Sequence, residues 1–497
     1  MSDESPFAAL AWAPKTSDSQ PEQAHSAAGD LLNSPLFSQP AAWGSQAVAS
    51  MASPVAAQVD WSVVEDLVST ISERVGDLSQ QYAAEHKGAD PDGETRRVMA
   101  APVIAEVVAG YASRREIDGE VWSQADEARY RKASFDQMFG MGRLQSLFEI
   151  PEAENVIVVG SQPVVVDFND GHQETRPPVA GSDQELMAQL QRMAGNATPR
   201  RAFDADHTDV TIMHEERFRI HAVSNEVALH PSVVIRQHLM TKITLADLSN
   251  RGMMPIDVAQ FLDAAVQDGA TIVVAGEQGV GKTTFLRALI DAIPLRERFA
   301  TLETDEELFA HRMAGRQGNL TLFARDGMGE IDPQTGRQTG AIEIGQLIPP
   351  ALRQSLTRII VGEVRGSEAS AMFQAMQSGA GTMSSIHARR PDEVSSRLAM
   401  MIAQGPVYTL EQAMLQIGQS VDFIVFLRRR DLADGSRIRF VERIERVEVG
   451  DGAHPNLGEI YVADEWSGQP VSFTPGQIAQ RYSRFTRDLN VSQGDHS

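Results

Sequence analysis

The chain has 497 residues, of which 42% are hydrophobic and 22% charged, values typical of a soluble globular protein with several domains. It contains no cysteine, which excludes disulfides, thiolate zinc sites and cysteine nucleophiles. The net charge of −23 disfavours a basic surface that follows a nucleic-acid backbone, so we expect no direct nucleic-acid partner.

No stretch approaches the roughly 18 consecutive apolar residues of a transmembrane helix, so we expect no membrane span. The N-terminus, Met1–Phe7, lacks the basic region and apolar core of a signal peptide. These two features predict a cytoplasmic protein, or one that partners hold at a membrane.

The chain begins with a segment of low complexity and continues with a helical one. Residues 1–58 are rich in Ser, Ala, Pro and Gln without a sustained period, which predicts a disordered arm. Residues 59–134 predict a helical segment, because apolar residues from Val63 onward follow amphipathic spacing. After a break at Gly88–Gly93, further helices are predicted over Val98–Ala112 and Ser123–Phe135.

Residues 135–240 predict a smaller α+β domain. Runs of β-branched residues bounded by turns predict an antiparallel sheet, and helical spacing over Glu185–Met193 adds a helix. The predicted strands are Asn155–Gly160, Pro163–Phe168, Asp209–Met213, Arg217–Val223 and Ser232–Arg236.

A glycine-rich loop organises the next part of the chain. The apolar run Thr271–Ala275 predicts a buried parallel strand, and helical spacing begins at Phe285. Between them lies Gly276-Glu277-Gln278-Gly279-Val280-Gly281-Lys282-Thr283-Thr284. Its glycine spacing in this context predicts a phosphate-binding loop, whose backbone N–H groups converge on the phosphates. Lys282 would pair with the β- and γ-phosphates, and the Thr283 hydroxyl would hold Mg²⁺.

Strands and helices alternate after this loop. The predicted strands are Phe299–Glu303, Arg358–Glu363 and Thr382–His387, and the predicted helices are Ile344–Leu356, Glu368–Gln377 and Pro391–Ile402. This order predicts an α/β domain over 241–447, with a parallel sheet that binds ligand at the carboxyl ends of its strands. Glu303, Glu363 and His387 fall at those ends, which makes them candidate catalytic residues.

The last part of the chain predicts a helix, a hairpin and a short extension. The helix covers Leu410–Ser420, and the hairpin pairs Asp422–Leu427 with Ile438–Val447. Residues 448–497 form the predicted C-terminal extension, with a strand at Glu459–Val462 and a last helix that begins at Thr474–Pro475.

Six further motifs accompany the phosphate loop. They are Phe139–Leu144, Arg217–Arg219, Ile235–Arg236, the acidic segment Thr301–Leu308, Ile360–Gly366 and Gly379–Ala388. With these motifs the chain, from about Phe139 to Val447, resembles the type II/type IV secretion-system ATPase superfamily, most closely its tight-adherence (Flp-type) pilus branch. The resemblance implies a RecA-like P-loop NTPase motor domain preceded by the smaller α+β domain and the helical segment.

The resemblance also implies ATP, Mg²⁺ and a homo-hexamer. Glu363 matches the carboxylate that reaches Mg²⁺ through water or orients the attacking water. Glu303 is the implied general base, and His387 the implied sensor of the γ-phosphate. The implied arginine fingers, from the same subunit or a neighbour, are Arg217, Arg219 and Arg236. The implied partner is an integral inner-membrane platform protein, which would keep the chain at the inner face of the cell membrane.

The chain departs from the family pattern at two positions. Thr304 stands where Asp is usual, so Glu303, Glu306 and Glu307 all remain candidates for the base. Ala380 stands where the first histidine of its motif is usual. The expected function is an ATP-hydrolysing motor for pilus assembly or protein secretion. The alternatives are the ATPase of a DNA- or effector-secreting type IV machine, and a nucleotide-gated scaffold with weak hydrolysis.

Overall fold

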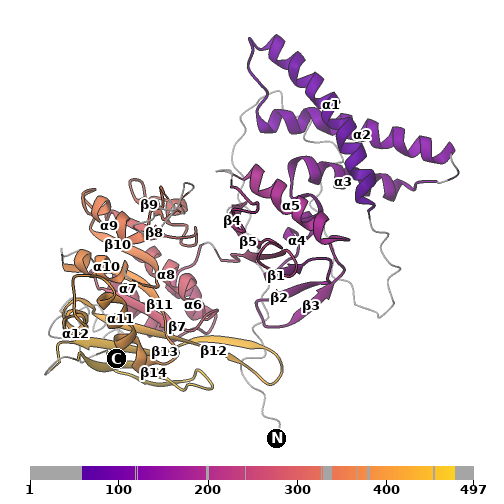
Figure 1. Ribbon diagram of the computed structural model, residues 1–497. Helices are drawn as coiled ribbons and strands as arrows, with labels where there is room; N and C mark the ends of the chain where they lie inside the picture. The colour runs from indigo at the N-terminus through magenta and orange to yellow at the C-terminus, as the bar shows by residue number, and fades with distance from the viewer. Residues whose placement is uncertain are drawn as a thin grey trace, which may run out of the picture. The chain divides into compact units, whose positions relative to one another are not determined.

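The computed structural model describes residues 59–117, 119, 121–197, 201–215, 217–240, 242–325, 327, 339–366, 368–377, 381–450 and 454–475. The arm predicted at 1–58, the position of Ala380 and the chain after Pro475 lie outside these residues. The chain divides into two compact units with the boundary after Ser134, and Figure 1 labels most of the helices and strands of both.

The first unit is helical, as predicted. Its helices are α1 (Trp61–Glu85), α2 (Gly93–Ile117) and the larger part of α3 (Gln124–Phe139). The Asp60 side chain caps α1 by accepting a hydrogen bond of 2.9 Å from the Ser62 N–H group. At helical spacing, α1 buries Val64, Leu67 and Ile71, and it packs along α2. Among the described helices, none has both the length and the apolar character that crossing a bilayer requires.

The second unit contains a six-stranded antiparallel sheet in the order β3-β2-β1-β6-β5-β4. Its strands are β1 (Ala153–Val159), β2 (Val164–Phe168), β3 (Gln173–Arg176), β4 (Asp209–His214), β5 (Phe218–Val223) and β6 (Ser232–Gln237). Helix α5 (Asp183–Asn196) packs Leu186 and Leu190 into the core of this sheet, and η1 (Gly142–Leu144) and α4 (Gln145–Phe148) precede it. The prediction omitted β3 because its four residues are all polar.

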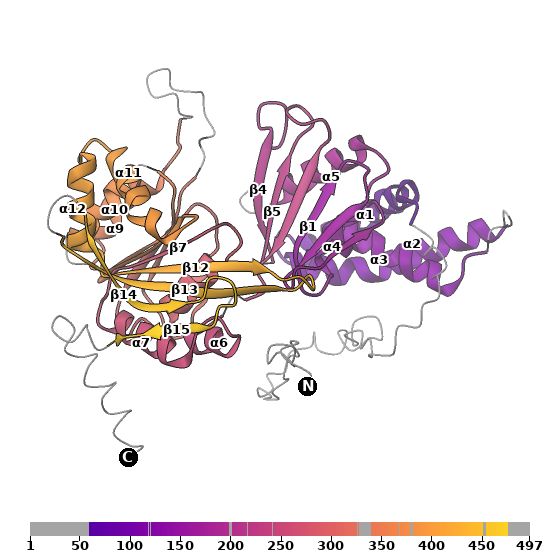
Figure 2. The same ribbon diagram turned by 90° about the horizontal axis from the view of Figure 1, so that it is seen from below.

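A second, nine-stranded sheet follows in the order β15-β14-β13-β12-β7-β11-β10-β8-β9. Its strands are β7 (Ile272–Gly276), β8 (Phe299–Glu303), β9 (Leu320–Phe323), β10 (Arg358–Val364), β11 (Gly381–His387), β12 (Phe423–Asp431), β13 (Arg437–Glu448), β14 (Asn456–Ala463) and β15 (Pro470–Phe473). The strands from β12 to β9 are parallel, and β12 to β15 form an antiparallel extension (Figure 2). The parallel order β12-β7-β11-β10-β8 is that of a RecA-like P-loop domain, as expected.

Helices cover both faces of the parallel strands. One group is α6 (Leu245–Asn250), α7 (Ile256–Gln267) and α8 (Lys282–Asp291), and the other is α9 (Ile344–Leu352), α10 (Glu368–Gln377), α11 (Val394–Ala403) and α12 (Leu410–Ser420). Ile272 and Val274 pack in a cluster with the first group, whereas Val273 packs with the second. Strand β7 is therefore buried on both faces, which explains its continuous apolar sequence.

Several predicted boundaries need correction. Helix α9 ends at Leu352 and not at Leu356, because Ser355 adopts a φ of 54°, which an α-helix does not accommodate. The helix predicted from Pro391 divides into a 3₁₀ turn, η3 (Pro391–Glu393), followed by α11. Another 3₁₀ turn, η2 (Ala310–Arg312), lies between β8 and β9.

The hairpin and the C-terminal extension differ most from the prediction. The hairpin is longer than predicted, since β12 continues to Asp431 and β13 begins at Arg437. The prediction ended earlier because the residues next to the turn are charged and do not follow an apolar strand pattern. Strands β9 and β15 were missed because each has four residues at a sheet edge. Strand β14 pairs with β13 and β15 pairs with β14, so the described part of 448–497 continues the sheet of the preceding domain.

Candidate nucleotide-binding site

The phosphate loop joins the buried strand β7 to helix α8. Gly281 occupies the N-cap position of α8 with a left-handed φ of 96°. A Cβ atom at Gly276 would lie 2.6 Å from the Leu427 carbonyl oxygen, so only glycine fits there. This backbone path presents N–H groups and the positive end of a ten-residue helix to an anion.

Lys282, the first residue of α8, is held over this loop. It is 7% exposed, and its Nζ donates to the carbonyl oxygens of Gly276 at 3.2 Å and Glu277 at 2.9 Å. Nζ also lies 3.2 Å from Nδ1 of His387. Burial lowers the pKa of Lys282 to about 8, which leaves the ammonium mostly protonated at neutral pH. The loop thus carries a buried positive charge where phosphates would bind.

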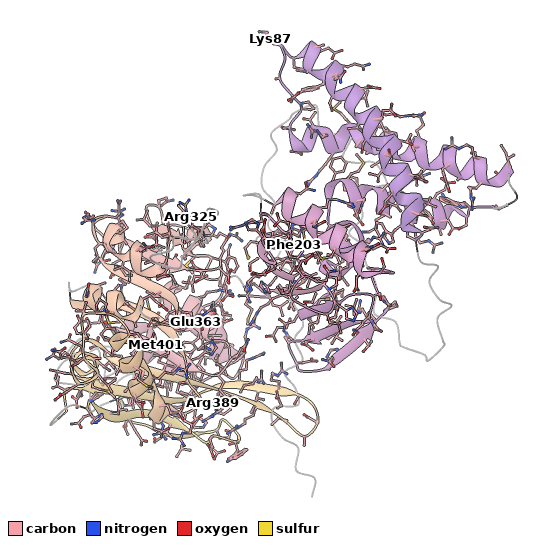
Figure 3. All side chains as sticks on the ribbon, in the orientation of Figure 1. Lys87, Phe203, Arg325, Glu363, Arg389 and Met401 are labelled. Atoms are coloured by element: carbon pink, nitrogen blue, oxygen red, sulfur yellow. The ribbon has the colours of Figure 1, made fainter. Side chains whose placement is uncertain are left out.

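His387, at the end of β11, connects Lys282 with Glu363 in β10. His387 Nε2 lies 2.8 Å from Oε1 of Glu363, and Arg365 Nη2 donates to Oε2 of Glu363 at 2.8 Å. An ammonium group has no acceptor, so Nδ1 of His387 accepts from Lys282 and the proton of a neutral imidazole sits on Nε2, facing Glu363. Glu363 is labelled in Figure 3.

The surroundings of Glu363 keep it ionised. Burial alone would raise its pKa, but hydrogen bonds from His387 and Arg365 outweigh burial and lower the pKa to about 2. At neutral pH the carboxylate is therefore an anion that accepts from both neighbours. A carboxylate in this state can orient water or a hydrated cation, but it is a poor proton acceptor.

The acidic segment begins at Glu303, the last residue of β8. Glu303 is 2% exposed, and its Oε2 accepts hydrogen bonds from the N–H groups of Glu307 at 2.9 Å and Leu308 at 2.7 Å. Burial raises the pKa of Glu303 to about 7. Glu303 therefore holds the backbone of this segment in place, and its pKa lies close to neutral pH.

Glu307 is the acidic residue that contacts the phosphate loop. Its Oε2 accepts a hydrogen bond of 3.1 Å from Thr283 Oγ1, and its Oε1 accepts one of 2.8 Å from Arg219 Nη1. Arg219 also donates to Asp305 at 3.3 Å. The structure thus places Glu307, and not Glu303, in contact with the predicted magnesium ligand Thr283.

Arg236 lies beside Arg219. The register of β5 and β6 sets Arg219 directly opposite Arg236. The Nη2 atom of Arg236 is 3.9 Å from Oε1 of Glu154, a residue of β1. Two of the three predicted arginine fingers therefore share one strand pair, and each is held by a carboxylate.

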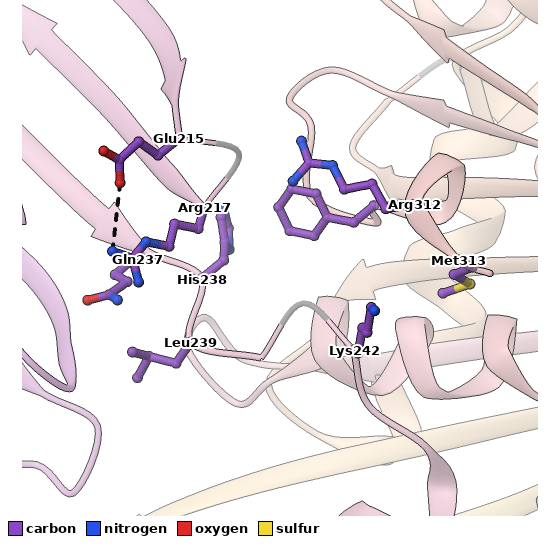
Figure 4. Close-up of a pocket in the computed structure, with 9 residues that line it drawn as sticks. Glu215, Arg217, Gln237, His238, Leu239, Lys242, Arg312 and Met313 are labelled. Carbon is purple, nitrogen blue, oxygen red and sulfur yellow. Dashed lines mark ion pairs between the residues drawn. The ribbon is translucent and has the colours of Figure 1, made fainter. Parts of the chain in front are cut away.

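Arg217 is in a different environment. It pairs with Glu215 at 3.7 Å and its guanidinium lies 4.6 Å from the centre of the Phe218 ring. It lines a pocket of about 410 Å³ (Figure 4). The other lining residues are Glu215, Gln237, His238, Leu239, Lys242, Phe309, Arg312 and Met313. Within the described part of the chain, no contact joins Arg217 to the phosphate loop, and Arg312 of the same pocket pairs with Glu306.

Arg287, on α8, is a buried cation that the motifs did not identify. It is 2% exposed and donates to the carbonyl oxygens of Glu307 and Met240, and its Nη2 lies 3.3 Å from His238 Nδ1. Burial lowers the pKa of Arg287 to about 10. Arg287 ties the phosphate-loop helix to the acidic segment and to the chain after β6. The sequence feature that could have indicated this residue is its position, since Arg287 is the single charged residue in the run Phe285–Ile290, whose residues are all buried.

The described residues contain no group of three or more His, Asp or Glu side chains arranged to hold a metal ion. Mg²⁺ bound to a nucleotide does not need one, because it keeps several waters and takes substrate oxygens with one or two protein ligands. The Thr283 hydroxyl beside Glu307, with the ionised Glu363 in the same site, fits that requirement.

The strand order and the glycine loop together define a RecA-like P-loop domain. Its glycine loop follows the central strand β7, and His387, Glu363 and Glu303 lie at the carboxyl ends of the next three strands on one side of β7, which are β11, β10 and β8. The family model described as "Type II/IV secretion system protein" matches residues 169–443, and the chain belongs to this family.

The chain is similar to individual proteins as well. The type IV secretion system protein PtlH of Bordetella pertussis is 37% identical over 188 residues, which are 37% of this chain and 52% of PtlH. The putative conjugal transfer protein Rv3659c of Mycobacterium tuberculosis is 28% identical over 333 residues, 63% of this chain and 89% of that protein. The crystal structure of the VirB11 ATPase from the Brucella suis type IV secretion system, in complex with sulphate, aligns at 24% identity and a TM-score of 0.31, over 62% of this chain and 97% of that one. The chain spans about half the length of PtlH.

Proposed function

We propose that this protein binds ATP with Mg²⁺ at the phosphate loop and hydrolyses it to drive pilus assembly or protein secretion. The observation that carries the proposal is the continuous contact path Lys282–His387–Glu363, which joins the loop to a strand-end carboxylate. If Lys282 had only a structural role, the loop would not require glycine at Gly276. Nor would such a role require a hydrogen-bonded carboxylate at the end of β10, two strands away from β7.

The residues of the loop bind and orient the substrate. Backbone N–H groups from Gly279 to Thr284 and the Lys282 ammonium offset the charge of the β- and γ-phosphates. The Thr283 hydroxyl and Glu363, the latter through water, would hold Mg²⁺. When bound, the metal neutralises charge that develops on the phosphate oxygens. The loop residues Gly276, Glu277 and Gln278 complete the cradle before α8.

Two carboxylates, Glu363 and Glu303, would activate the attacking water, each in a different role. The ionised Glu363 orients the attacking water, and its partner His387 reports on the γ-phosphate because it also contacts Lys282. Proton acceptance falls to the acidic segment, where the pKa of Glu303, raised by burial to about 7, suits a general base. Glu307 is the alternative base, supported by its contact with Thr283.

The arginines Arg219 and Arg236 supply charge to the γ-phosphate. In this structure Arg219 is bound to Glu307 and Asp305, so it must exchange these partners to reach a phosphate. A bound γ-phosphate, or a neighbouring subunit in a homo-hexamer, would favour that exchange. Arg217 would act in the same way only after leaving Glu215.

The machine that the motor serves is a secretion or pilus system. The family assignment supports an integral membrane platform protein as the partner and a position at the inner face of the cell membrane. The names of PtlH and of the conjugal transfer protein support a type IV machine that exports effectors or DNA as the second candidate. The loss of the histidine at Ala380 supports the third, a scaffold that binds ATP and hydrolyses it weakly.

The test is steady-state ATP turnover of the full chain, with its mass in solution measured in parallel. A motor turns over ATP with Mg²⁺ and loses this activity in Lys282→Ala, while a scaffold binds nucleotide without turnover. Absence of nucleotide binding by the wild-type chain would overturn the proposal. Co-purification distinguishes the two kinds of motor. A membrane platform protein or pilin as the partner indicates the pilus or secretion motor, and a DNA-transfer protein indicates the type IV machine.

A further inference from the structure

The β12–β13 hairpin brings an arginine into contact with the phosphate loop. Arg439, in β13, pairs with Arg429, which lies in the part of β12 beyond the predicted strand Asp422–Leu427. Its Nε donates a hydrogen bond of 2.9 Å to the carbonyl oxygen of Gly279. Arg429 also approaches Gly279, because a Cβ atom added there would lie 2.9 Å from Arg429 Nη1.

This contact determines the direction of one peptide unit in the loop. Gly279 has a φ of 75°, and its carbonyl points at Arg439. In a planar trans peptide the N–H of the next residue points the opposite way, so the Val280 N–H points away from Arg439. In a phosphate-binding loop that direction is toward the anion. A cationic donor on the carbonyl also polarises the peptide, which makes the Val280 N–H a stronger donor.

The guanidinium of Arg439 is fixed on its other sides. Its Nη2 pairs with Oε2 of Glu154 at 2.9 Å, and its Nη1 donates to the Asn169 carbonyl oxygen at 3.3 Å. The Glu154 side chain is 17% exposed and that of Arg439 24%. Three separate acceptors therefore hold one planar fork, a task that lysine cannot perform.

We propose that Arg439 is a positioning residue for nucleotide binding, which holds the Gly279–Val280 peptide in its phosphate-binding orientation, with Glu154 holding Arg439. The inference rests on the proposed function, since it deepens the account of the same site. Glu154 also lies 3.9 Å from Arg236, so one carboxylate faces both the loop-holding arginine and a proposed arginine finger. Nucleotide affinity and the release of Arg236 are thereby linked through Glu154.

The variants are Arg439→Ala, Arg439→Lys and Glu154→Gln, measured in the full chain. A hydrogen bond to a charged group contributes enough that Arg439→Ala should weaken the binding of Mg-ADP about tenfold or more. KM for ATP should rise by a similar factor, with a smaller change in kcat. Glu154→Gln should weaken ADP binding less, because the amide oxygen still accepts from Arg439.

Arg443→Ala is the matched control, since Arg443 lies on the same strand but pairs with the exposed Glu459 at 2.7 Å. It should bind ADP as the wild-type chain does. Thermal unfolding of each variant shows whether it is folded, and Arg439→Lys provides the measurement if Arg439→Ala is not. Wild-type ADP affinity in a folded Arg439→Ala or Arg439→Lys would overturn the inference. Failure of the wild-type chain to bind ADP would instead overturn the proposed function.

Discussion

The Nε2 atom of His387 lies 2.8 Å from Oε1 of Glu363, at the carboxyl ends of the parallel strands β11 and β10. The opposite ring nitrogen of His387 faces Lys282, so the imidazole transmits the position of the phosphate-loop lysine to the carboxylate. Movement of the Lys282 ammonium onto a phosphate would remove the donor at Nδ1. Under the proposed function, this contact would couple nucleotide binding to the orientation of Glu363.

Replacing Lys282 with alanine should weaken nucleotide binding strongly and abolish ATP turnover without unfolding the chain. The variant removes a buried cation that is held over the loop, and charge-assisted hydrogen bonds of this kind account for roughly a tenfold to hundredfold change in affinity. Titration with Mg-ADP measures the loss. Lys242→Ala is the control, because Lys242 lines the pocket of Figure 4 and contacts no loop residue among those described. Equal ADP affinity in both variants would contradict the phosphate-loop assignment.

Replacing Glu363 with glutamine should preserve nucleotide binding and stop hydrolysis. The amide keeps the shape of the side chain and still accepts from His387 or Arg365, but it lacks the charge that orients water. Single-turnover measurements with saturating ATP separate the chemical step from binding. The same measurement on Glu303→Gln and Glu307→Gln identifies the base. Loss of turnover in Glu307→Gln alone would show that the residue contacting Thr283, and not Glu303, accepts the proton.

The buried Glu303 should give stability an unusual pH dependence. Its pKa is raised by burial from 4.5 to about 7, so the native state binds the proton more tightly than the unfolded state. The stability contributed by protonation is complete below about pH 4.5 and is lost as the pH rises to about 7. Glu303→Gln cannot ionise, so its melting temperature relative to wild type should increase between pH 5 and pH 8. A constant difference would show that Glu303 is ionised throughout.

The pH dependence of turnover tests the same carboxyl as the base. If Glu303 accepts the proton, kcat should rise through about pH 7, where its carboxylate forms. Glu363 cannot produce this limb, because hydrogen bonds that outweigh its burial lower its pKa to about 2. A profile that is flat from pH 6 to pH 8 would contradict Glu303 as the base.

The sequence predicted the elements of this site that depend on local pattern. The phosphate loop, its strand and its helix follow from glycine spacing and a buried apolar run, and the alternation of strands and helices placed Glu303, Glu363 and His387 at one edge of the sheet. The antiparallel sheet before them was predicted for the same reason, except for the polar strand β3.

Contacts between charged residues that are far apart in the sequence could not be predicted from it. Arg439 and Glu154 are 285 positions apart, and both resemble exposed surface residues in the sequence. Arg287 occupies a helical position where an apolar residue is expected, and only the fold reveals its acceptors at Glu307 and Met240. The sequence likewise could not show which carboxylate of the acidic segment contacts Thr283, because that depends on how the segment turns after β8. In the structure the contact is made by Glu307.

Hydrolysis should depend on assembly, because Arg219 and Arg236 are bound to carboxylates in the isolated chain. Arg219 contacts Glu307 and Asp305, and Arg236 faces Glu154, so neither is available to a phosphate until a partner or the nucleotide competes for these contacts. Arginine delivered to a transferring phosphoryl group typically raises the rate by about 10³ to 10⁵.

Specific activity should therefore rise with protein concentration as rings form, and Arg236→Ala should bind ATP but turn over at least about tenfold more slowly, a conservative figure since Arg219 lies opposite it. Turnover is measured against concentration, with mass in solution at each point, and Arg443→Ala serves as the control. A monomer with full, concentration-independent activity, or an Arg236→Ala ring with wild-type turnover, would eliminate an arginine finger at this position. In the latter case a loss of activity in Arg219→Ala would assign the finger to the neighbouring strand.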